Sequence, residues 1–492
     1  MPIRKKIENL RQIAFDHTFN LINQTCQNIC KKYESYDDAT CAKEVLELNQ
    51  FLFANLCSIF LDDMLQKRDK CLNIKDPRIL IATLTNPLTR CFKMETPRDA
   101  YIPKQFWISL IHSLNNLVSL DMALICNDKL LSVVGNSCPK LEYINATSSY
   151  KRIQSDFNAL LLSRNVSDKG LHCLLSCQQL RKIVIDEPRG KFTHGITYKG
   201  IEELITKLKF LEEINFTDIA AIINKPYLKG VTLKLKNITQ FKISVQKIKI
   251  FEKTCPNLKC LILTNFSADE NESYAALDYM AESVIHLESI KLSYFGYNSA
   301  VQKYFQMKGS FLTSIIFIGD AERSIAAEDI HHIGKYCPNL MRLHIEKIAF
   351  FDNGLTESVY DKNMFKFIKT LHLSGLRWDV EHILPLCLSN TIYIEKISLI
   401  INDENYNDHN PYRVENVLAK IFNKNTAALK SLESLYLYNP IAVTVEFITF
   451  LLAKCDNLQA LNVWCEDHEK CSTLQKTLIS DNFDINFQYD LE

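Results

Sequence analysis

Residues 340–345 read Leu340-Met-Arg-Leu343-His-Ile345, with apolar side chains at the first, fourth and sixth positions. Side chains two residues apart in a strand point to the same face, so the fourth and sixth positions share one face. The pattern begins at twelve places in the chain, which are Leu117, Leu141, Leu180, Leu211, Leu258, Leu287, Leu312, Leu340, Ile368, Ile394, Leu432 and Leu458. A weaker copy begins at Leu228. The sequence therefore predicts many short strands of the same design.

The spacing of these copies indicates the fold. From Leu258 to Ile394 the copies start 25 to 29 residues apart. Leucine-rich repeats have periods of ~20–29 residues, and each contains a strand and a helix. Segments between the copies, such as residues 445–455, have helical spacing of apolar residues. Because one repeat cannot bury its apolar side alone, stacked repeats share a core. We expect an α/β leucine-rich-repeat solenoid, with a curved parallel sheet on the concave face and helices on the convex face.

Composition excludes several classes of function. The chain has 492 residues, with 57 basic and 57 acidic side chains, so its formal charge is zero. General nucleic-acid and membrane-surface binders carry a basic excess, so the sequence predicts neither partner. The first twelve residues, MPIRKKIENLRQ, lack the apolar run of a secretory signal. The 17 cysteines are an odd number in a long chain. Reduced, mostly buried thiols are therefore expected, and with them a cytoplasmic or nuclear location.

A cysteine lies three residues before the first leucine in five repeats. The five segments are Cys138-Pro-Lys-Leu141, Cys177-Gln-Gln-Leu180, Cys255-Pro-Asn-Leu258, Cys337-Pro-Asn-Leu340 and Cys455-Asp-Asn-Leu458. These segments resemble the cysteine-containing class of leucine-rich repeat over residues 104–465. In that class the cysteine ends the helix and packs as a small apolar residue. Residues 166–171, Val-Ser-Asp-Lys-Gly-Leu, are similar to the segment with which helices of this class begin.

The resemblance carries expectations about function. The class is typical of F-box/leucine-rich-repeat proteins and of a related group with an elongin-binding (VHL-type) box. Both groups are substrate receptors of cullin-RING ubiquitin ligases, in which one end binds an adaptor and the repeats bind the substrate. The resemblance thus implies a substrate-recognition subunit. A stand-alone leucine-rich-repeat scaffold or inhibitor, without a ligase link, is the alternative.

Residues 1–70 have helical spacing but no repeat, and we expect them to form a helical segment before a solenoid of residues 71–492. The resemblance implies that this segment binds a cullin adaptor, either a Skp-type protein or elongin C. In an elongin-type register, Leu10 takes the leucine position and Ala14 replaces the usual cysteine. The adaptor-binding candidates are Leu10, Ala14, Leu52, Leu56 and Phe60. Alternatively, these helices only cap the first repeat, because the ends of a solenoid need a cover.

Outward strand positions follow the first apolar residue of a repeat by two, four and six residues. We expect them to line the concave face and to contact a protein substrate, since exposed aromatic and arginine side chains often anchor interfaces. The candidates are Arg342, His344, His372, Lys396, Tyr436, Tyr438 and Trp464. The outward charges over all repeats are mixed in sign, which does not indicate a polyacidic or phosphate-like ligand. For Trp464 the alternative is that it only covers the last repeat, beneath a strand at residues 484–487.

The sequence contains no catalytic signature such as GxGxxG, a P-loop, HExxH or GxSxG. Cys465, His468 and Cys471 could supply three soft metal ligands, whereas structural zinc normally has four. We therefore predict a binding protein and not an enzyme, with no catalytic residue, no metal ligand and no cofactor.

Overall fold

The computed structural model describes residues 10–33, 35–68, 74–94, 102–123, 125–147, 166–185, 195–228, 230–265, 270–319, 324–346, 349–351, 363–376, 380–401, 413–438, 441, 443–464, 468–480 and 486–490. The chain divides into two compact units. The N-terminal unit is Glu8–Ile238 with Thr254–Asn257. The C-terminal unit is Thr239–Lys253 with Leu258–Glu492; its remaining segment, Met1–Ile7, lies outside the described residues.

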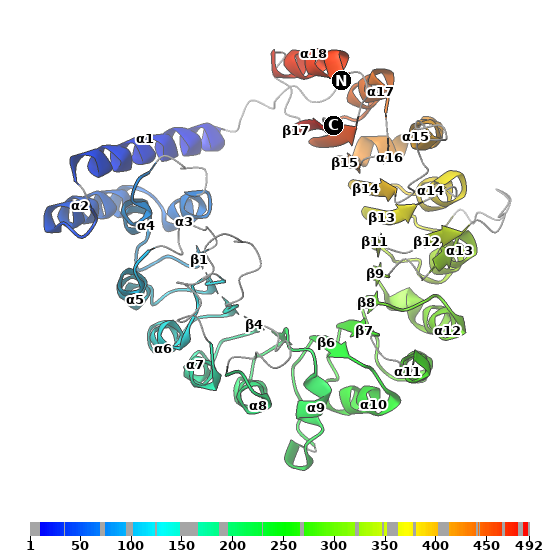
Figure 1. The fold of residues 1–492 in the computed structure, drawn as a ribbon, viewed down its shortest axis with the longest axis horizontal. Helices are drawn as coiled ribbons and strands as arrows, with labels where there is room; N and C mark the ends of the chain where they lie inside the picture. Colours follow the sequence, from blue (N-terminus) through cyan, green and yellow to red (C-terminus); the bar gives the residue numbers. More distant parts are fainter. Residues whose placement is uncertain are drawn as a thin grey trace. The chain divides into compact units, whose positions relative to one another are not determined.

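Fifteen strands of the described residues form one sheet whose order follows the chain, and neighbouring strands run parallel (Figure 1). These strands are β1 (Cys91–Lys93), β2 (Ser119–Asp121), β3 (Tyr143–Asn145), β4 (Lys182–Val184), β5 (Glu213–Ile214), β6 (Asn237–Phe241), β7 (Cys260–Thr264), β8 (Ser289–Ser293), β9 (Ser314–Ile318), β11 (Arg342–Glu346), β13 (Thr370–Leu376), β14 (Lys396–Ile401), β15 (Ser434–Leu437), β16 (Ala460–Trp464) and β17 (Asn486–Asp490). A separate parallel pair is formed by β10 (Ser324–Ala326) and β12 (Ala349–Phe351).

Helices connect successive strands, and within each unit they lie on one side of the sheet (Figure 1). The N-terminal unit contains α1 (Leu10–Lys32), α2 (Ala39–Asn55), α3 (Ser58–Gln66), α4 (Pro77–Leu84), α5 (Lys104–Ser113), α6 (Asp128–Ser137), α7 (Asp168–Cys173), α8 (Tyr198–Lys207) and α9 (Ile219–Ile223). After them come α10 (Val245–Thr254), α11 (Glu270–Glu282), α12 (Ser299–Lys308), α13 (Ala327–Tyr336), α14 (Val380–Leu388), α15 (Arg413–Lys424), α16 (Thr426–Ser431), α17 (Val445–Lys454) and α18 (His468–Ser480). None of the helices in the described part of the chain is long and apolar enough to cross a membrane.

The repeated apolar residues form the core, as the sequence predicts. Leu340, Leu343 and Ile345 have no exposed surface. Leu343 is the Cα partner of Ile315 on β9 and of Leu371 on β13, so equivalent residues lie side by side along the sheet. Burying one such side chain is worth about 1.5–3 kcal/mol, which explains why the pattern recurs in each repeat. The chain therefore has the α/β leucine-rich-repeat solenoid fold.

The repeat cysteines end their helices and pack inside. The backbone N–H of Cys138 donates to the carbonyl of Val134, and that of Cys337 donates to Ile333, both over 2.9 Å. Both thiols are fully buried, and burial raises the pKa of the Cys138 thiol to about 12. A Cβ atom on Gly309 would lie 2.7 Å from the Cys337 sulfur. This cysteine therefore fits against the preceding repeat only because residue 309 is glycine.

Hydrogen bonds between successive repeats hold neighbouring helices together. The Ser167 hydroxyl and backbone N–H donate to the Asp128 carboxylate over 2.5 and 2.7 Å. Ser167 is also the N-cap of α7, because its side chain accepts from the N–H of Lys169. The same arrangement occurs three times among the described residues: Asp128 with Ser167, Asp168 with Thr197, and Glu415 with Thr444.

Two details of the sheet differ from the sequence expectation. The weak copy at Leu228 does not provide a strand; β6 begins later, at Asn237, and Val231 is exposed. In β6 the second inward position holds Gln240, which is fully buried and donates to the carbonyl of Phe241. The first strand, β1, was not among the twelve copies, because Thr89 occupies the position of the first leucine and is fully buried there.

The N-terminal segment is helical, and its helices pack on the start of the repeat array. Helices α1, α2 and α3 each contact α4, and α3 also contacts β1. One side of these helices faces inward, with buried residues that include Phe15, Phe19, Ile22, Cys26, Cys41, Val45, Leu61 and Met64. The segment thus covers the first repeat of the N-terminal unit.

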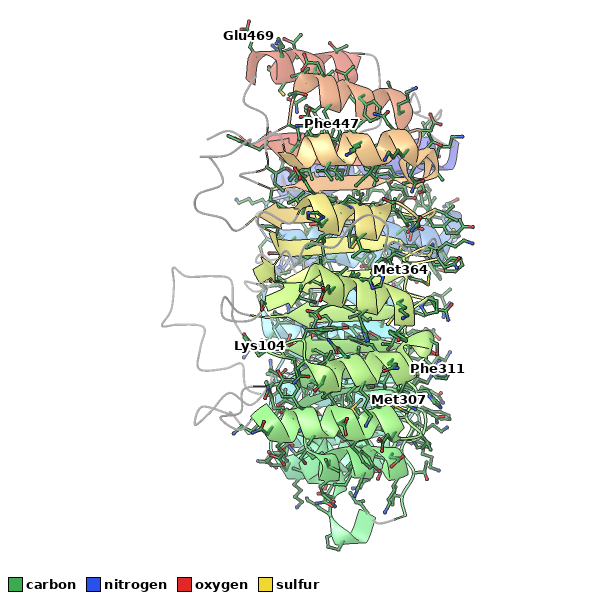
Figure 2. All side chains as sticks on the ribbon, turned by 90° about the vertical axis from the view of Figure 1, so that its right-hand side faces the viewer. Lys104, Met307, Phe311, Met364, Phe447 and Glu469 are labelled. Carbon is green, nitrogen blue, oxygen red and sulfur yellow. The ribbon has the colours of Figure 1, made fainter. Side chains whose placement is uncertain are left out.

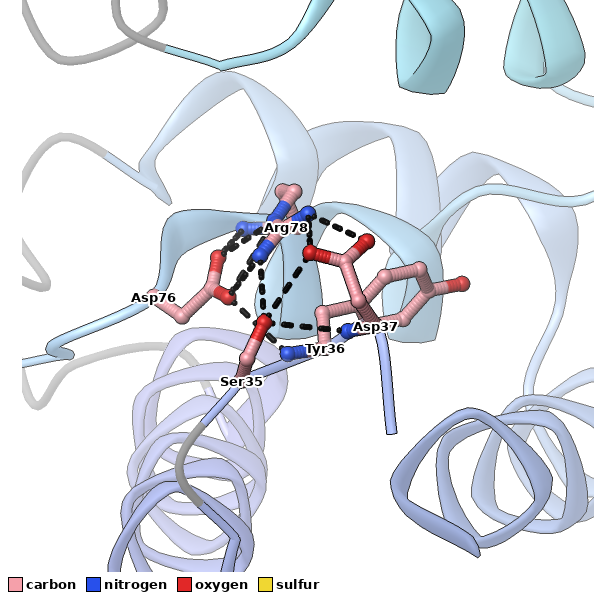
Figure 3. Close-up of polar contacts among 5 residues, drawn as sticks. All are labelled: Ser35, Tyr36, Asp37, Asp76 and Arg78. Carbon is pink, nitrogen blue, oxygen red and sulfur yellow. Dashed lines mark hydrogen bonds and ion pairs between the residues drawn. The ribbon is translucent and has the colours of Figure 1, made fainter. Parts of the chain in front are cut away.

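A polar cluster fixes the connection between α1 and α2 to α4 (Figure 3). The Arg78 guanidinium donates to Asp76 over 2.8 and 3.0 Å, to Asp37 over 2.9 Å and to Ser35 over 3.0 Å. These bonds raise the pKa of Arg78 and lower that of Asp37. The adjacent Tyr36 ring contacts Phe106 of α5 edge to face, with centroids 5.5 Å apart. The helical segment is therefore joined to the first two repeats by charge-assisted and aromatic contacts.

Candidate functional site

The sheet face opposite the helices, here called the open face, carries the outward strand positions of each unit. On the C-terminal unit, consecutive Cα partners place one residue of each strand in a central row. The row contains His344, His372, Ser398, Tyr436, Asn462 and Gln488. Three of the predicted partner-binding residues thus lie in one line across the sheet. Arg342 and Lys396 lie two residues before this row, and Trp464 lies two residues after it.

Two histidines form the centre of the open face. The rings of His344 and His372 stack with centroids 4.1 Å apart and an interplanar angle of 20°. His372 Nδ1 shares a 2.9 Å hydrogen bond with the Ser398 hydroxyl, and His344 Nε2 lies 3.2 Å from the Glu346 carboxylate. Burial, with the neighbouring His344 ring, lowers the pKa of His372 to about 4. Burial also lowers the pKa of His344, although Glu346 opposes this change. Both rings are therefore neutral near pH 7.

Aromatic residues follow on the next strands. The Tyr436 and Tyr438 rings stack with centroids 6.4 Å apart, and Lys396 Nζ lies 4.8 Å from the centre of the Tyr436 ring. Tyr438 is exposed, whereas Tyr436 is half-buried. Trp464 is half-buried on the neighbouring strand and is the Cα partner of Asp490 in β17. A strand therefore does follow Trp464, at Asn486–Asp490, and Trp464 is half-buried beside it.

Four isoleucines on the open face were not named among the candidates. Ile262, Ile316, Ile318 and Ile400 occupy outward positions and are half-buried. Ile316 is the Cα partner of His344. They could have been found from the spacing, because they follow the first leucine of a repeat by four or six residues. In strands as apolar as Ser314–Ile318, however, inward and outward isoleucines look alike.

The open face of the N-terminal unit is different in character. Lys182 Nζ lies 2.7 Å from the Glu213 carboxylate, and the amide of Asn237 donates to the same carboxylate over 2.7 Å. The amide of Asn145 donates to Asp121 over 3.0 Å. Outward side chains here bond to one another across neighbouring strands. The exposed apolar residues of the C-terminal unit are therefore the stronger candidate for partner binding.

The adaptor candidates differ in their burial. The Leu10 side chain lies outside the described residues, and Ala14 is exposed on α1. Leu52 is buried in the chain as folded, with 5% of its surface exposed, so it belongs to the core. Leu56 and Phe60 are half-buried, and the Phe60 ring contacts Phe15 with centroids 5.0 Å apart.

Other apolar residues of these helices are exposed to solvent. Phe51 of α2 is 63% exposed and Ile59 of α3 is 62% exposed. Ile13 and Leu21 of α1 and Leu46 and Phe53 of α2 are also exposed. The helices thus cover the first repeat with one side and leave large apolar side chains on the other. The sequence pattern did not separate these groups, because both have helical spacing.

Among the residues that the structure describes, no three His, Cys, Asp or Glu side chains lie close enough together to hold a metal ion. Of the possible ligands near the C-terminus, Cys465 and the His468 side chain lie outside the described residues. Cys471 is buried.

No family model matches the chain, and no curated protein matches it. Among solved structures, the chain is similar to the crystal structure of the Rad7 and Elc1 complex in yeast, with a TM-score of 0.43, 12% identity, and coverage of 94% of this chain and 96% of that chain. It is also similar to the leucine-rich-repeat-containing protein LegL7 from Legionella pneumophila, with a TM-score of 0.36, 13% identity, and coverage of 68% and 98% respectively.

Proposed function

We propose that this chain is a protein-binding subunit that recognises a substrate for a cullin-RING ubiquitin ligase. The observation that carries the binding role is the row of half-exposed histidine, tyrosine and isoleucine side chains on the open face of the C-terminal unit. These side chains are held by a sheet whose inward residues are fully buried. Binding therefore costs little conformational entropy on this side of the interface.

The ligase role is supported by the repeat cysteines. Cys138, Cys177 and Cys337 are buried at the ends of their helices, as expected from the resemblance to the cysteine-containing class of leucine-rich repeat. They are thiols, which supports a cytoplasmic or nuclear location, where thiols stay reduced. A receptor of this type contributes proximity and no bond-making chemistry, so the chain would not be an enzyme.

The N-terminal helices supply a surface for an adaptor. Phe51 and Ile59 are 63% and 62% exposed, whereas Leu52 is 5% exposed. We assign adaptor contact to these exposed residues together with Ala14, Leu56 and Phe60, and we exclude Leu52 because it is buried. The adaptor would be a Skp-type protein or elongin C.

Recovery of the ligase components from a native lysate tests this proposal. Tagged full-length protein should recover a cullin and one of the two adaptors, and the double variant Phe51→Glu, Ile59→Glu should lose both. The control is Met307→Glu, which places one such charge on an exposed apolar position of α12 among the helices (Figure 2). If the unmodified protein recovers no cullin, Skp-type protein or elongin, the ligase role is wrong and the chain is a stand-alone scaffold or inhibitor.

A further inference from the structure

The charges on the open face of the C-terminal unit are unbalanced. Among the described side chains at its outward strand positions, the cations are Lys291, Arg342 and Lys396, and the one carboxylate is Glu346. That carboxylate already contacts His344. Arg342 and Lys291 form no ion pair with a described residue. On the N-terminal unit, by contrast, Lys182 is paired with Glu213. The excess of positive charge is therefore specific to one unit.

The geometry of the strands brings these cations within reach of one ligand. Arg342 is the Cα partner of Thr370, and Thr370 is the Cα partner of Lys396. Neighbouring strands lie about 4.7–4.9 Å apart, so the backbones at Arg342 and Lys396 are roughly 10 Å apart. Their long side chains can converge on one carboxylate between them. Both are exposed, and the histidine stack lies two residues further along the strands.

Apolar side chains flank this cationic centre on both sides. Ile316 and Ile318 lie on β9, beside Arg342–Glu346 of β11, and Tyr436 lies on β15, beside Lys396–Ile401 of β14. All three are half-buried, so they offer apolar surface to a partner without needing to move. A ligand that fits must therefore combine a negative charge with apolar groups on either side of it.

We propose that the open face of the C-terminal unit binds a peptide segment of its protein partner in which one or two acidic residues are flanked by aliphatic or aromatic residues. The acidic group contacts Arg342 and Lys396, while its neighbours pack on Ile316, Ile318, Tyr436 and Tyr438. This inference rests on the protein-binding part of the proposed function and is independent of the ligase role. A nucleic-acid backbone fits less well, because nucleic-acid affinity comes mainly from many Lys and Arg contacts to phosphates and such binding would leave the isoleucines unused.

Selection of peptides from a random library displayed on phage, with the full-length protein as bait, tests the proposal. Enriched peptides should contain Asp or Glu beside aliphatic or aromatic residues. A selected peptide, labelled for fluorescence polarisation, should bind at least about tenfold more weakly to the double variant Arg342→Glu, Lys396→Glu, because two attractive charges are replaced by repulsive ones. The matched control, Lys454→Glu, reverses an exposed lysine of α17 on the helical side and should bind unchanged.

Three results would contradict the proposal. They differ in whether the open face remains a binding site for peptides. Peptides that bind less well to Tyr438→Glu but are neutral or basic would refute the acidic preference and leave the open face as a binding site. If binding of every enriched peptide is unchanged by Tyr438→Glu, or if no peptide is enriched, both the acidic preference and the binding role of this face are wrong. Tighter binding of a single-stranded oligouridylate than of any selected peptide would assign the cations to nucleic acid instead.

Discussion

The rings of His344 and His372 lie nearly parallel on the open face, 4.1 Å apart, on strands that are direct neighbours in the sheet. The groups that face this pair are Glu346, Arg342, Lys291 and Lys396, and three of these four are cations. Protonation of either ring would place a further positive charge among them and against the other ring. The surroundings of the pair therefore favour its neutral form, which connects the charge of the open face with its response to pH.

Mild acid should destabilise the protein through His372. The pKa of this residue is about 4 in the folded chain against an ordinary 6.5. Between these values the unfolded chain binds a proton that the folded chain does not. The contribution of His372 to the free energy of unfolding is therefore complete above pH 6.5 and is lost as the pH decreases towards 4. Between pH 7 and 5.5 we expect a loss of about 1 kcal/mol or less, because His372 is only partly buried. Urea denaturation at pH 7 and 5.5 measures it.

The variant His372→Gln should lose less stability between these two pH values than the unmodified protein. His17→Gln, at an exposed position of α1, serves as the matched control and should behave like the unmodified protein. The same pH dependence in His372→Gln and in the unmodified protein would contradict the role assigned to the histidine pair.

Removal of one inward leucine should show that the repeats share a core. Leu343 has no exposed surface and lies between Ile315 and Leu371. Leu343→Ala should lower the free energy of unfolding by about 2–5 kcal/mol, because the lost methyl groups leave a cavity between two neighbours. The adjacent Met341 is 39% exposed, so Met341→Ala should change stability by less than about 0.5 kcal/mol. Equal effects of the two substitutions in thermal denaturation would disprove the inward assignment of Leu343.

The sequence predicted the inward residues well because their physical requirement is simple. Each repeat must bury three side chains, and in most repeats all three are apolar, as with Leu340, Leu343 and Ile345. The prediction failed where a polar residue is buried through its own hydrogen bonds. Thr89 replaces the first leucine before β1, and Gln240 replaces an inward leucine in β6. A pattern of apolar residues cannot detect such positions.

The candidate site could be predicted only in part. The outward positions of Tyr436 and His372 follow from the two-residue period of a strand, and the structure places them on the open face. Contacts between different repeats do not follow from the pattern, and the ring stack of His344 with His372 is of this kind. In the N-terminal helices, the buried Leu52 and the exposed Phe51 are neighbours in sequence. Only the packing of α2 against its neighbouring helices distinguishes them.

The bonds between repeats should be worth a measurable part of the stability. Asp128 accepts two hydrogen bonds from Ser167 in the next repeat. Bonds to a charged group contribute about 1.5–3 kcal/mol, so Asp128→Ala should destabilise the protein by ~2 kcal/mol. Glu446 is an exposed acid in the first turn of α17, and Glu446→Ala should cost less than about 1 kcal/mol through the helix dipole alone. If both substitutions lower the melting temperature equally, the bonds to Ser167 contribute nothing beyond the dipole.

Loss of the Arg78 guanidinium should release the N-terminal helices from the first repeat. Its side chain is 11% exposed and is paired with Asp76, which is 17% exposed. Removing one partner of a largely buried ion pair typically costs about 3 kcal/mol or more, because Asp76 then keeps a charge without a counterion. Arg78→Met should therefore increase amide hydrogen exchange in α1 and α2, while exchange in β11 of the C-terminal unit stays unchanged. Arg78→Lys should have an intermediate effect on exchange, since one ammonium group cannot bind Asp76, Asp37 and Ser35 together.

Arg181 is the control for this prediction, because it is 49% exposed and contacts Glu142 and Glu212. Arg181→Met should leave exchange in α1 and α2 unaltered. Faster exchange in β11 of Arg78→Met would mean that the cluster stabilises the whole chain and not the N-terminal cap.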